Sequence, residues 1–519
     1  MSPRKDRDRD GTTAEDDNAA LALLGYRSSG LRRTLGGFHT FAAGISYLSV
    51  LTGTFQLFYF GVAFGGPAYW WSWPLVFLGQ LAVALCFCEL ASRYPVAGSV
   101  YNWAKALGGP HIGWLGGWMM LTATMVTLAA VALAYQLTLP MIDQRFLIVE
   151  DTAVNAVLLG SALIVFATLV NAFGVRLMAR INSAGVFIEL IAAVVLIVLL
   201  ATEVTRGPGA VLTETHGLGD GGTLGWFGAF LTASLASAYV MYGFDTASSL
   251  GEESRDPSRN APRAILRALV ATFVLGGSIL LLALMAVPDL AADELSAQGL
   301  QYVVLTVLGP TAGEAVLWCV VIAITVCVLA VQAAGIRLMF AMARDNNLPA
   351  GRVLSHISPR FGTPVVPAVA IGVVGVAVLV LNVGQPQIFS VLTSIAIIMI
   401  YLAYLLVTAP QLMQRLRDRR NGQDGPQPAP GSFSLGRWGL PVNIVAVVWG
   451  AAMALNLAWP RAEVYNATGP QHWYLRWGAF LFVGAVALGG FAYYWFVQRH
   501  RTGVREEHRA PQQPPAAPR

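Results

Sequence analysis

The run Tyr242-Gly243-Phe244-Asp245 places an acidic side chain inside a long apolar stretch of the sequence. Removing a carboxylate from water costs several kcal/mol unless it is paired, hydrogen-bonded or protonated. Such a group can bind an amine, exchange a proton, or accept backbone hydrogen bonds at a helix end. Glu189 raises the same question, because it lies about two turns after Asn182 in another apolar stretch.

The sequence lacks the residue patterns of an enzyme or a metal site. We find no nucleophile with a base, no metal-ligand spacing and no phosphate loop, so we predict no catalytic residue, metal or cofactor. Four cysteines, Cys86, Cys88, Cys319 and Cys327, lie in apolar runs and are interpreted as buried core residues. The net charge of +5 is explained by membrane orientation and anionic lipid headgroups, and we expect no nucleic-acid partner.

Composition indicates a membrane protein. Hydrophobic residues make up 56% of the chain and charged residues 12%, whereas an ordinary soluble chain has about 25% charged residues. Apolar segments of about 20 residues, the length that crosses a hydrocarbon core, recur along the whole chain. We place twelve spans at 38–63, 74–92, 113–139, 153–173, 183–204, 225–250, 264–287, 312–335, 365–383, 390–409, 438–459 and 474–497.

The distribution of basic residues predicts the orientation of these spans. Of the 33 lysines and arginines, only Arg145, Arg206, Arg461 and Arg476 fall on one face, and all the others fall on the opposite face or in the tails. The basic face is the cytoplasmic one by the positive-inside rule. We therefore expect a multi-pass protein of the plasma membrane, in contact with lipid, with both termini in the cytoplasm.

Polar segments divide the chain into five parts. Segments rich in charge, Pro, Gln and Gly are typical of disordered tails and linkers. We predict a disordered cytoplasmic N-tail at 1–37, a ten-helix transport core at 38–409 and a cytoplasmic linker at 410–437. Peripheral helices eleven and twelve follow at 438–497, and a disordered cytoplasmic C-tail at 498–519.

Spans one and six have weak points near their middle. Gly44, Ser49, Thr52 and Gly53 interrupt span one, and the stretch from Gly243 to Asp245 interrupts span six. Freed backbone groups are tolerated at membrane depth only where they face protein or a water-filled cavity. Two breaks five spans apart predict an all-α membrane protein with a five-plus-five inverted repeat and broken helices one and six. The alternative is that these glycines only allow close helix packing.

Three motifs resemble one family of transporters. The stretch FDTASSLGEESRDPSRNAPRAI resembles the sixth span and following loop of the amino acid/polyamine/organocation (APC) superfamily. ELASRYPVAGSVYNWAKALGGPHIGWLGGW and GIRLMFAMARDNNLP are similar to its loops after spans two and eight. SVLTGTFQLFYFGVAFGGP most resembles the amino acid/choline transporter branch. The resemblance implies the five-plus-five repeat, peripheral spans eleven and twelve, and transport by alternating access.

The two breaks predict a binding site for a small zwitterion. A half-helix that starts near Gly53 would direct its amides toward a substrate carboxylate. The carbonyls of 49–51 and 241–243 would accept from a substrate ammonium. Aromatic rings in the second break would cover an apolar group or a quaternary ammonium, or only pack in the core or against lipid. The predicted substrate-binding residues are Ser49, Thr52, Gly53, Tyr242, Gly243, Phe244 and Asp245.

Ion coupling is predicted to involve Glu189, Asp245 and Thr325. Asp245 either pairs with a substrate amine or orders the broken helix, and we favour the structural or coupling role. Proton-coupled relatives resemble this chain but have a lysine at the place of Glu189, so their coupling cannot be carried over. Glu189 and Asp245 could approach one another and share a proton. Glu189 with Thr325 could instead bind sodium, and a glutamate that only reaches the interface is the third possibility.

The cytoplasmic end of span six is rich in charge. Glu252 and Glu253, with Arg259, Arg263 and Arg255, are predicted to form an ionic latch of the inward gate. The alternative is a solvated loop, because surface ion pairs contribute under about 1 kcal/mol.

A secondary active transporter is the function that fits these features. We expect a zwitterionic amino acid or 4-aminobutyrate as substrate, with proton coupling. Choline or a polyamine, and sodium coupling or exchange, are the alternatives. A channel lacks its rings of charge here, and a transporter-like sensor would need a larger cytoplasmic extension. The sequence leaves the oligomeric state and the direction of physiological flux open.

Overall fold

The computed structural model describes Tyr26 and residues 36–215, 224–381, 383, 388–422, 432–465 and 472–509. These residues form helices and a single isolated antiparallel bridge between Tyr26 and Arg509. Ten helical segments in the described part of the chain are long and apolar enough to span a membrane. Trp226–Val240 and Val365–Leu381 are shorter apolar helices at the places of spans six and nine. The predicted all-α membrane fold is confirmed, and the count of twelve stays a prediction.

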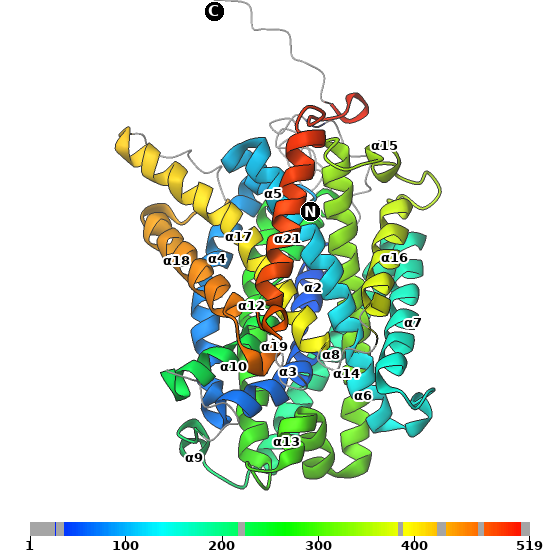
Figure 1. Cartoon of the computed structure of the whole chain (residues 1–519), viewed down its shortest axis with the longest axis vertical. Coiled ribbons are helices and arrows are strands. Elements are labelled where there is room, and N and C mark those ends of the chain that lie inside the picture. The colour runs from blue at the N-terminus through cyan, green and yellow to red at the C-terminus, as the bar shows by residue number, and fades with distance from the viewer. Residues whose placement is uncertain are drawn as a thin grey trace, which may run out of the picture.

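The long helices follow the order of the predicted spans (Figure 1). The first repeat comprises α2 (Gly37–Leu48) with α3 (Val50–Gly65), α4 (Ser72–Arg93), α5 (Ser99–Ala132) with α6 (Ala134–Ile142), α7 (Thr152–Phe173) and α8 (Val175–Thr202). The second comprises α10 (Trp226–Val240) with α11 (Thr246–Ser249), α12 (Pro257–Ala286), α14 (Leu300–Arg344), α16 (Val365–Leu381) and α17 (Ile388–Arg420). Outside them lie α18 (Gly439–Ala458) and α21 (Gly478–Tyr493).

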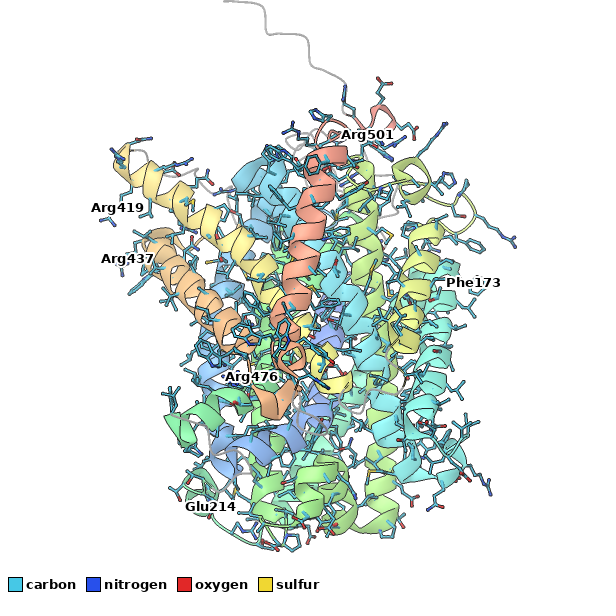
Figure 2. All side chains as sticks on the ribbon, in the orientation of Figure 1. Phe173, Glu214, Arg419, Arg437, Arg476 and Arg501 are labelled. Carbon is cyan, nitrogen blue, oxygen red and sulfur yellow. The ribbon has the colours of Figure 1, made fainter. Side chains whose placement is uncertain are left out.

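Short helices mark the two ends of the bundle. One end carries α9 (Pro208–Leu212) and α13 (Asp293–Gln298), and the opposite end carries α15 (Gly351–Leu354) (Figure 1). The helices α19 (Ala462–Tyr465) and α20 (Trp473–Arg476) connect α18 to α21. Figure 2 shows Arg419 and Arg501 toward the end with α15, and Glu214 at the other end. The end with α15 is therefore the predicted cytoplasmic face.

Two matching bends support the inverted repeat. Helix α5 bends at Gly109 (φ 83°, ψ −178°), which precedes Pro110. Helix α14 bends at Gly309 (φ 75°, ψ 172°), which precedes Pro310. The preceding glycine can adopt positive φ, and proline cannot donate to the helical ladder. The Gly-Pro pairs lie before spans three and eight, at opposite ends of the bundle, as an inverted duplication requires.

The packing of the helices shows the same exchange between repeats. Helix α5 packs against α17, and α14 packs against α8. Helix α16 also packs against α5, as α7 packs against α14. In span numbers, span three packs against spans ten and nine, and span eight packs against spans five and four. Each contact thus has a counterpart in which every span is replaced by the span five positions away. The two halves are therefore packed as an inverted repeat around α2, α3 and α10.

Three predicted segment descriptions need correction. Helix α17 continues to Arg420, so the first part of the predicted linker at 410–437 is helical. Residues 498–509, expected in a disordered tail, pack on the end of α14, where Gly503 N donates to Asp345 O at 3.0 Å. Tyr26, expected in the other disordered tail, is buried with 1% exposure. The polar composition of these segments favours disorder, but Tyr26 bonds to Asn102 and Asp345, and residues 503–505 bond to the end of α14.

Candidate functional site

The break in span one lies at Ser49, four residues before the position predicted from Gly53. Ser49 has φ 34° and ψ 93°, an unfavourable conformation for a residue with a side chain. Gly53 continues the next helix, since its amide donates to Ser49 O at 2.9 Å. A Cβ on Gly53 would approach Val240 Cγ2 to 2.8 Å. Gly53 thus allows α3 to pack closely on α10, and the helix N-terminus begins at Val50.

Glu189 explains where the first break occurs. Its side chain extends from α8 into the break, where Oε1 accepts hydrogen bonds from Ser49 Oγ at 2.9 Å and Leu51 N at 3.2 Å. Ser49 Oγ also lies 2.6 Å from Thr52 Oγ1. Glu189 is 2% exposed, so the alternative of a side chain that reaches the membrane interface is wrong. A carboxylate at the N-terminus of α3 satisfies amides that have no helical partner.

The other carboxylate oxygen of Glu189 is available for a proton or a ligand. Oε2 is buried and has no hydrogen-bond partner among the described residues. The same holds for Asn182 Oδ1, Ser46 Oγ, Thr246 Oγ1 and Ser248 Oγ, which lie on helices that border the two breaks. Buried polar atoms are rarely left without a partner unless water or a ligand supplies one.

Thr325 lies apart from this group. Its hydroxyl contacts Tyr135 Oη at 2.7 Å and donates to Val321 O at 2.7 Å. Helix α14 instead brings Cys327 to the first break, where its thiol lies 3.6 Å from Tyr47 O. The structure therefore does not join Thr325 to Glu189 as the sequence-based sodium site requires. The sequence places α14 near the break but does not give the rotation of the helix, which decides whether Thr325 or Cys327 faces the break.

The break in span six runs from Met241 to Asp245 and includes the expected stretch from Gly243 to Asp245. Gly243 has φ 89°, and a Cβ there would overlap the ring of Tyr47. Gly243 N donates to Tyr404 Oη at 2.9 Å, and this hydroxyl donates to Asp245 Oδ1 at 2.6 Å. Ser99 Oγ donates to the other oxygen, Oδ2, at 2.9 Å. Both oxygens of Asp245 are thus held by protein hydroxyls, which favours its structural role.

Asp245 and Glu189 serve different breaks. Asp245 is bonded from α5 and α17, and Glu189 from the start of α3. Their polar contacts share no residue, and Asp245 makes no side-chain cap for α11. The expected sharing of one proton between the two carboxylates therefore gains no support from the geometry.

The aromatic residues of the second break are enclosed by protein. The ring of Tyr242 packs on the rings of Tyr47 and Tyr239, with centroids 6.1 and 5.8 Å apart. Phe244 is fully buried and lies 5.9 Å from Phe87. Neither ring faces lipid. Tyr242 contacts Tyr47, which lies next to the first break. Phe244 instead packs in the core against Phe87 of α4.

The ion pairs at the predicted cytoplasmic face differ from those that the sequence predicted. Glu252 pairs with Arg344 at 3.1 Å, and Glu253 pairs with Arg337 at 3.0 Å. All four side chains are buried. Arg259 is half-exposed and lies 3.9 Å from Asp256, and Arg263 is exposed on α12. These two ion pairs join the segment after span six to span eight.

The sequence contains a signal for these partners. Arg337 and Arg344 are seven residues apart in GIRLMFAMAR, so they lie on one face of a helix. Basic residues on an otherwise apolar helix face need acidic partners. The consecutive Glu252 and Glu253 could have been matched to them.

Cavities lie on either side of the two breaks. A small cavity of about 10 Å³ lies toward the predicted cytoplasmic face and includes Asn182, Thr246 and Ala334 in its lining. Another of about 10 Å³ lies toward the opposite face, between Gly53, Tyr69 and Val240. Each of these cavities is large enough for about one water molecule.

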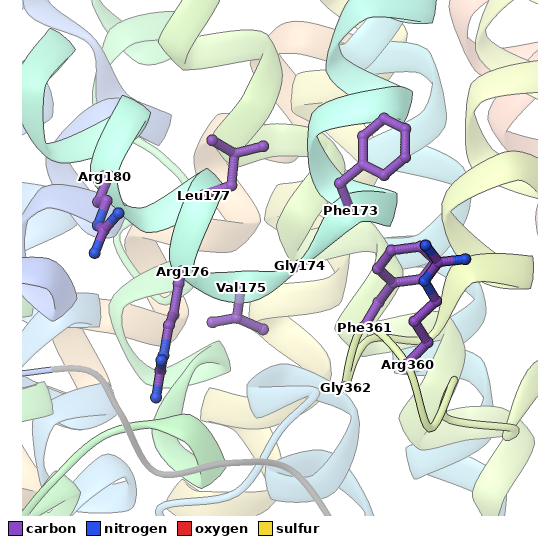
Figure 3. Close-up of a pocket in the computed structure, with 9 residues that line it drawn as sticks. All are labelled: Phe173, Gly174, Val175, Arg176, Leu177, Arg180, Arg360, Phe361 and Gly362. Atoms are coloured by element: carbon purple, nitrogen blue, oxygen red, sulfur yellow. The ribbon is translucent and has the colours of Figure 1, made fainter.

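A wider hollow of about 330 Å³ lies elsewhere, where α7 meets α8 (Figure 3). Its lining includes three arginines and no acidic residue: Phe173, Gly174, Val175, Arg176, Leu177, Arg180, Arg360, Phe361 and Gly362. No residue of either break lines it, so it is not the predicted substrate site.

Comparisons with known proteins agree with this architecture. The family described as "Amino acid permease" matches residues 35–486. The amino-acid permease BAT1 of Arabidopsis thaliana is 26% identical over 476 residues, covering 86% of this chain and 90% of that protein. The thiamine transporter thi9 of Schizosaccharomyces pombe is 27% identical over 568 residues, covering 96% of this chain and 90% of that protein.

A solved structure shares the fold. The crystal structure of MhsT in complex with L-phenylalanine superposes with a TM-score of 0.57 at 14% identity, covering 82% of this chain and 99% of that one. Together with the match over most of the sequence, this identifies a transporter rather than an enzyme. The chain is a multi-pass membrane protein that belongs to the amino acid permease family.

Proposed function

We propose that this chain is a secondary active transporter that carries a zwitterionic amino acid or 4-aminobutyrate by alternating access, coupled to protons through Glu189. Its place is the plasma membrane, with both termini in the cytoplasm. The observation that carries the proposal is the contact of Glu189 with the break in span one. A buried acidic side chain holds the amide of Leu51 with one oxygen, and its other oxygen has no partner among the described residues.

This contact suggests how a proton could change the site. Ionised Glu189 is held by the N-terminus of α3, whose dipole favours negative charge. Protonation removes that charge and weakens the bonds to Ser49 and Leu51. The amides at the start of α3 are then free to bind a substrate carboxylate. Proton binding would thereby be linked to substrate binding, which is what symport requires.

The rest of the site fits an ammonium group with an apolar body. Carbonyls near the breaks at Ser49 and Gly243 are the acceptors for the ammonium. The rings of Tyr242 and Tyr47 pack edge to face against each other, and both residues lie next to the breaks. These rings also suit a quaternary ammonium, so choline is the second candidate. A polyamine is a weaker candidate, because both oxygens of Asp245 are already bonded within the protein.

The energetic requirement is modest. One proton that crosses a membrane potential of 100 mV provides about 2.3 kcal/mol. This corresponds to nearly two orders of magnitude of substrate accumulation.

The test is uptake into proteoliposomes with imposed gradients. We expect accumulation to follow the pH gradient without sodium. Glu189→Gln retains an oxygen acceptor for Ser49 and Leu51 but cannot titrate, so it should keep substrate exchange and lose concentrative uptake. Glu203→Gln, an exposed position after the same helix, is the control and should behave as the unchanged protein. Sodium-dependent accumulation, or a Glu189→Gln variant that still concentrates substrate, would contradict proton coupling.

Substrate class is tested by thermal shift with purified protein. A ligand at a hundred times its dissociation constant adds about 2.7 kcal/mol to stability. The panel should contain α-amino acids, 4-aminobutyrate, choline, polyamines and thiamine. Stabilisation by carboxylate-free amines alone would reject the amino acid as substrate.

A further inference from the structure

Tyr26 is buried against the ion pair of Glu252 and Arg344, at the predicted cytoplasmic end of the bundle. The guanidinium carbon of Arg344 lies 3.7 Å from the centre of the Tyr26 ring. The Tyr26 hydroxyl lies 2.8 Å from Asp345 Oδ2 and 3.0 Å from Asn102 Oδ1. Lys105 contacts both this hydroxyl and Asp345. Tyr26 therefore touches α5 and the end of α14 at once.

Arg344 is held on two sides. Its terminal nitrogens donate to both oxygens of Glu252, at 3.2 and 3.1 Å, and its planar face rests on the Tyr26 ring. Glu252 also accepts from Ala97 N at 3.0 Å, in the loop before α5. A planar guanidinium can make edge and face contacts together, which a lysine could not. The tyrosine ring thus fixes the plane in which Arg344 meets Glu252.

The C-terminal segment closes over the same place. Gly503 N donates to Asp345 O at 3.0 Å, and Arg505 N donates to Arg344 O at 3.1 Å. Arg509 forms the isolated antiparallel bridge with Tyr26. Tyr26 and residues 503–509 therefore cover Arg344 and Asp345, next to the ion pair with Glu252.

We propose that Tyr26 is a positioning residue of an inward gate formed by the ion pairs Arg344–Glu252 and Arg337–Glu253. Tyr26 holds Arg344 on Glu252 and must leave before a substrate passage opens from the two breaks to the cytoplasm. This inference rests on the proposed alternating-access transport. Residues 503–509 keep Tyr26 in place through the bridge at Arg509. When Tyr26 leaves, water reaches Arg344 and Asp345. Ion pairs weaken in water, so the contact between span six and span eight is released more readily.

The charges around Tyr26 favour the buried, neutral form of its phenol. Burial, with Asp345 beside it, holds the pKa of the Tyr26 phenol well above its usual value. The phenol therefore stays neutral, and its hydroxyl can donate to Asp345. Arg344 and Lys105 are balanced there by Glu252 and Asp345, so a neutral ring completes the cluster without adding charge.

The test measures access to the passage and needs no substrate. A single cysteine is introduced by Ala334→Cys, at the cavity one turn before Arg337, in a protein whose four native cysteines are replaced. A membrane-impermeant maleimide is added from the cytoplasmic side. Tyr26→Ala removes both the ring and the hydroxyl, and we expect labelling about five- to thirtyfold faster, the range of a desolvated cation–π contact. Tyr26→Phe keeps the ring over Arg344 and should restore most of the protection.

Two further variants keep the result interpretable. Gly503→Pro lacks the N–H that bonds Asp345 O and should also speed labelling. Tyr474→Ala, at a half-exposed tyrosine on the predicted outer face, should not change it. Melting temperatures measured in parallel separate gate opening from unfolding.

Each outcome has a defined meaning. Unchanged labelling in folded Tyr26→Ala and Gly503→Pro would overturn the positioning role. Equal acceleration in Tyr26→Phe and Tyr26→Ala would overturn the part assigned to the ring. Faster labelling in a protein that moves no substrate of a broad panel would keep the gate role and reject the proposed transport.

Discussion

The hydroxyl of Tyr404 bridges the break in span six, because it accepts from Gly243 N at 2.9 Å and donates to Asp245 Oδ1 at 2.6 Å. Glu189 makes the corresponding contact in the first repeat, where span five bonds the break in span one. The last span of each repeat thus holds the break in its first span. The break in span six is held by the neutral Tyr404 phenol, and the break in span one by the acidic side chain of Glu189. The contact that holds the span-one break can therefore change when its holding side chain takes up a proton.

We predict that Tyr404→Phe destabilises the protein. The change leaves Gly243 N and Asp245 Oδ1 without their shared partner at a buried site, which costs about 1–3 kcal/mol. The melting temperature in detergent should fall, and maximal transport should fall with it. Asp245→Asn should likewise lower the melting temperature. An Asp245→Asn protein of unchanged stability that binds substrate weakly would instead indicate direct pairing with the substrate amine.

Gly243→Ala is expected to prevent formation of the second break. Gly243 has φ 89°, and a Cβ there overlaps the Tyr47 ring. The backbone strain and the overlap together cost more than about 2 kcal/mol. Gly484→Ala on α21 meets nothing within 4 Å and serves as the control. Thermal unfolding of the two variants should differ clearly, and equal melting temperatures would show that the break tolerates a side chain.

Single substitutions in the buried pairs Glu252–Arg344 and Glu253–Arg337 should lower the stability of the protein or weaken the proposed gate. Glu253→Gln leaves Arg337 without its acidic partner, and loss of one partner of a buried pair costs about 3–5 kcal/mol. We expect low yields of folded protein or faster labelling of the passage from the cytoplasm. Size-exclusion profiles and the cysteine assay measure these two effects.

Arg259 and Arg263 supply the matched controls for the gate. Both are exposed, and an exposed pair contributes under about 1 kcal/mol. Arg259→Ala and Arg263→Ala should therefore leave stability and labelling nearly unchanged. If they open the passage as Glu253→Gln does, the assignment of the gate to Arg337 and Arg344 is wrong.

Docking of residues 503–509 should weaken in acid. Burial lowers the pKa of His508, and Arg344 and Arg505 lower it further, while Glu507 and Glu252 act in the opposite direction. The docked segment therefore binds fewer protons than the released one. Docking is strongest above the usual histidine pKa of about 6.5 and weakens as the pH falls through that value. Hydrogen exchange of this segment, corrected for intrinsic rates, measures the effect.

His508→Phe is the control for this pH dependence. It keeps a ring near Phe340, which lies 6.2 Å from the His508 ring, but cannot take up a proton. Protection in this variant should change little with pH. Stronger protection of the unchanged protein in acid would contradict the predicted sign.

Much of the fold could be predicted from the sequence, because lipid restricts the backbone so strongly. Apolar length and basic loops located the spans, and the glycine at 243 located the second break. The first break was misplaced because its cause is Glu189, a side chain from a distant span. The Gly-Pro pairs at 109–110 and 309–310 carried a signal for the repeat that periodicity alone did not reveal.

The site residues were predictable as types but not as partners. Glu189 and Asp245 stood out because a buried acid needs a partner, yet their partners Leu51 and Tyr404 depend on how helices rotate against one another. Tyr26 gave no sign at all. A lone tyrosine in a polar tail looks like solvent-exposed chain until α14 and α5 provide a place for it.

The connected charges at the cytoplasmic end also bear on rate. Arg344, Glu252 and Asp345 are buried and form one cluster with the partly exposed Lys105, and Tyr26 touches three of these four residues. If the cytoplasmic end opens as proposed, release of Tyr26 and separation of these ion pairs disrupt several contacts together, so we expect this step to have a large activation enthalpy. Where inward opening limits turnover, transport should therefore slow steeply on cooling, with a strongly inclined Arrhenius plot that Tyr26→Ala makes shallower.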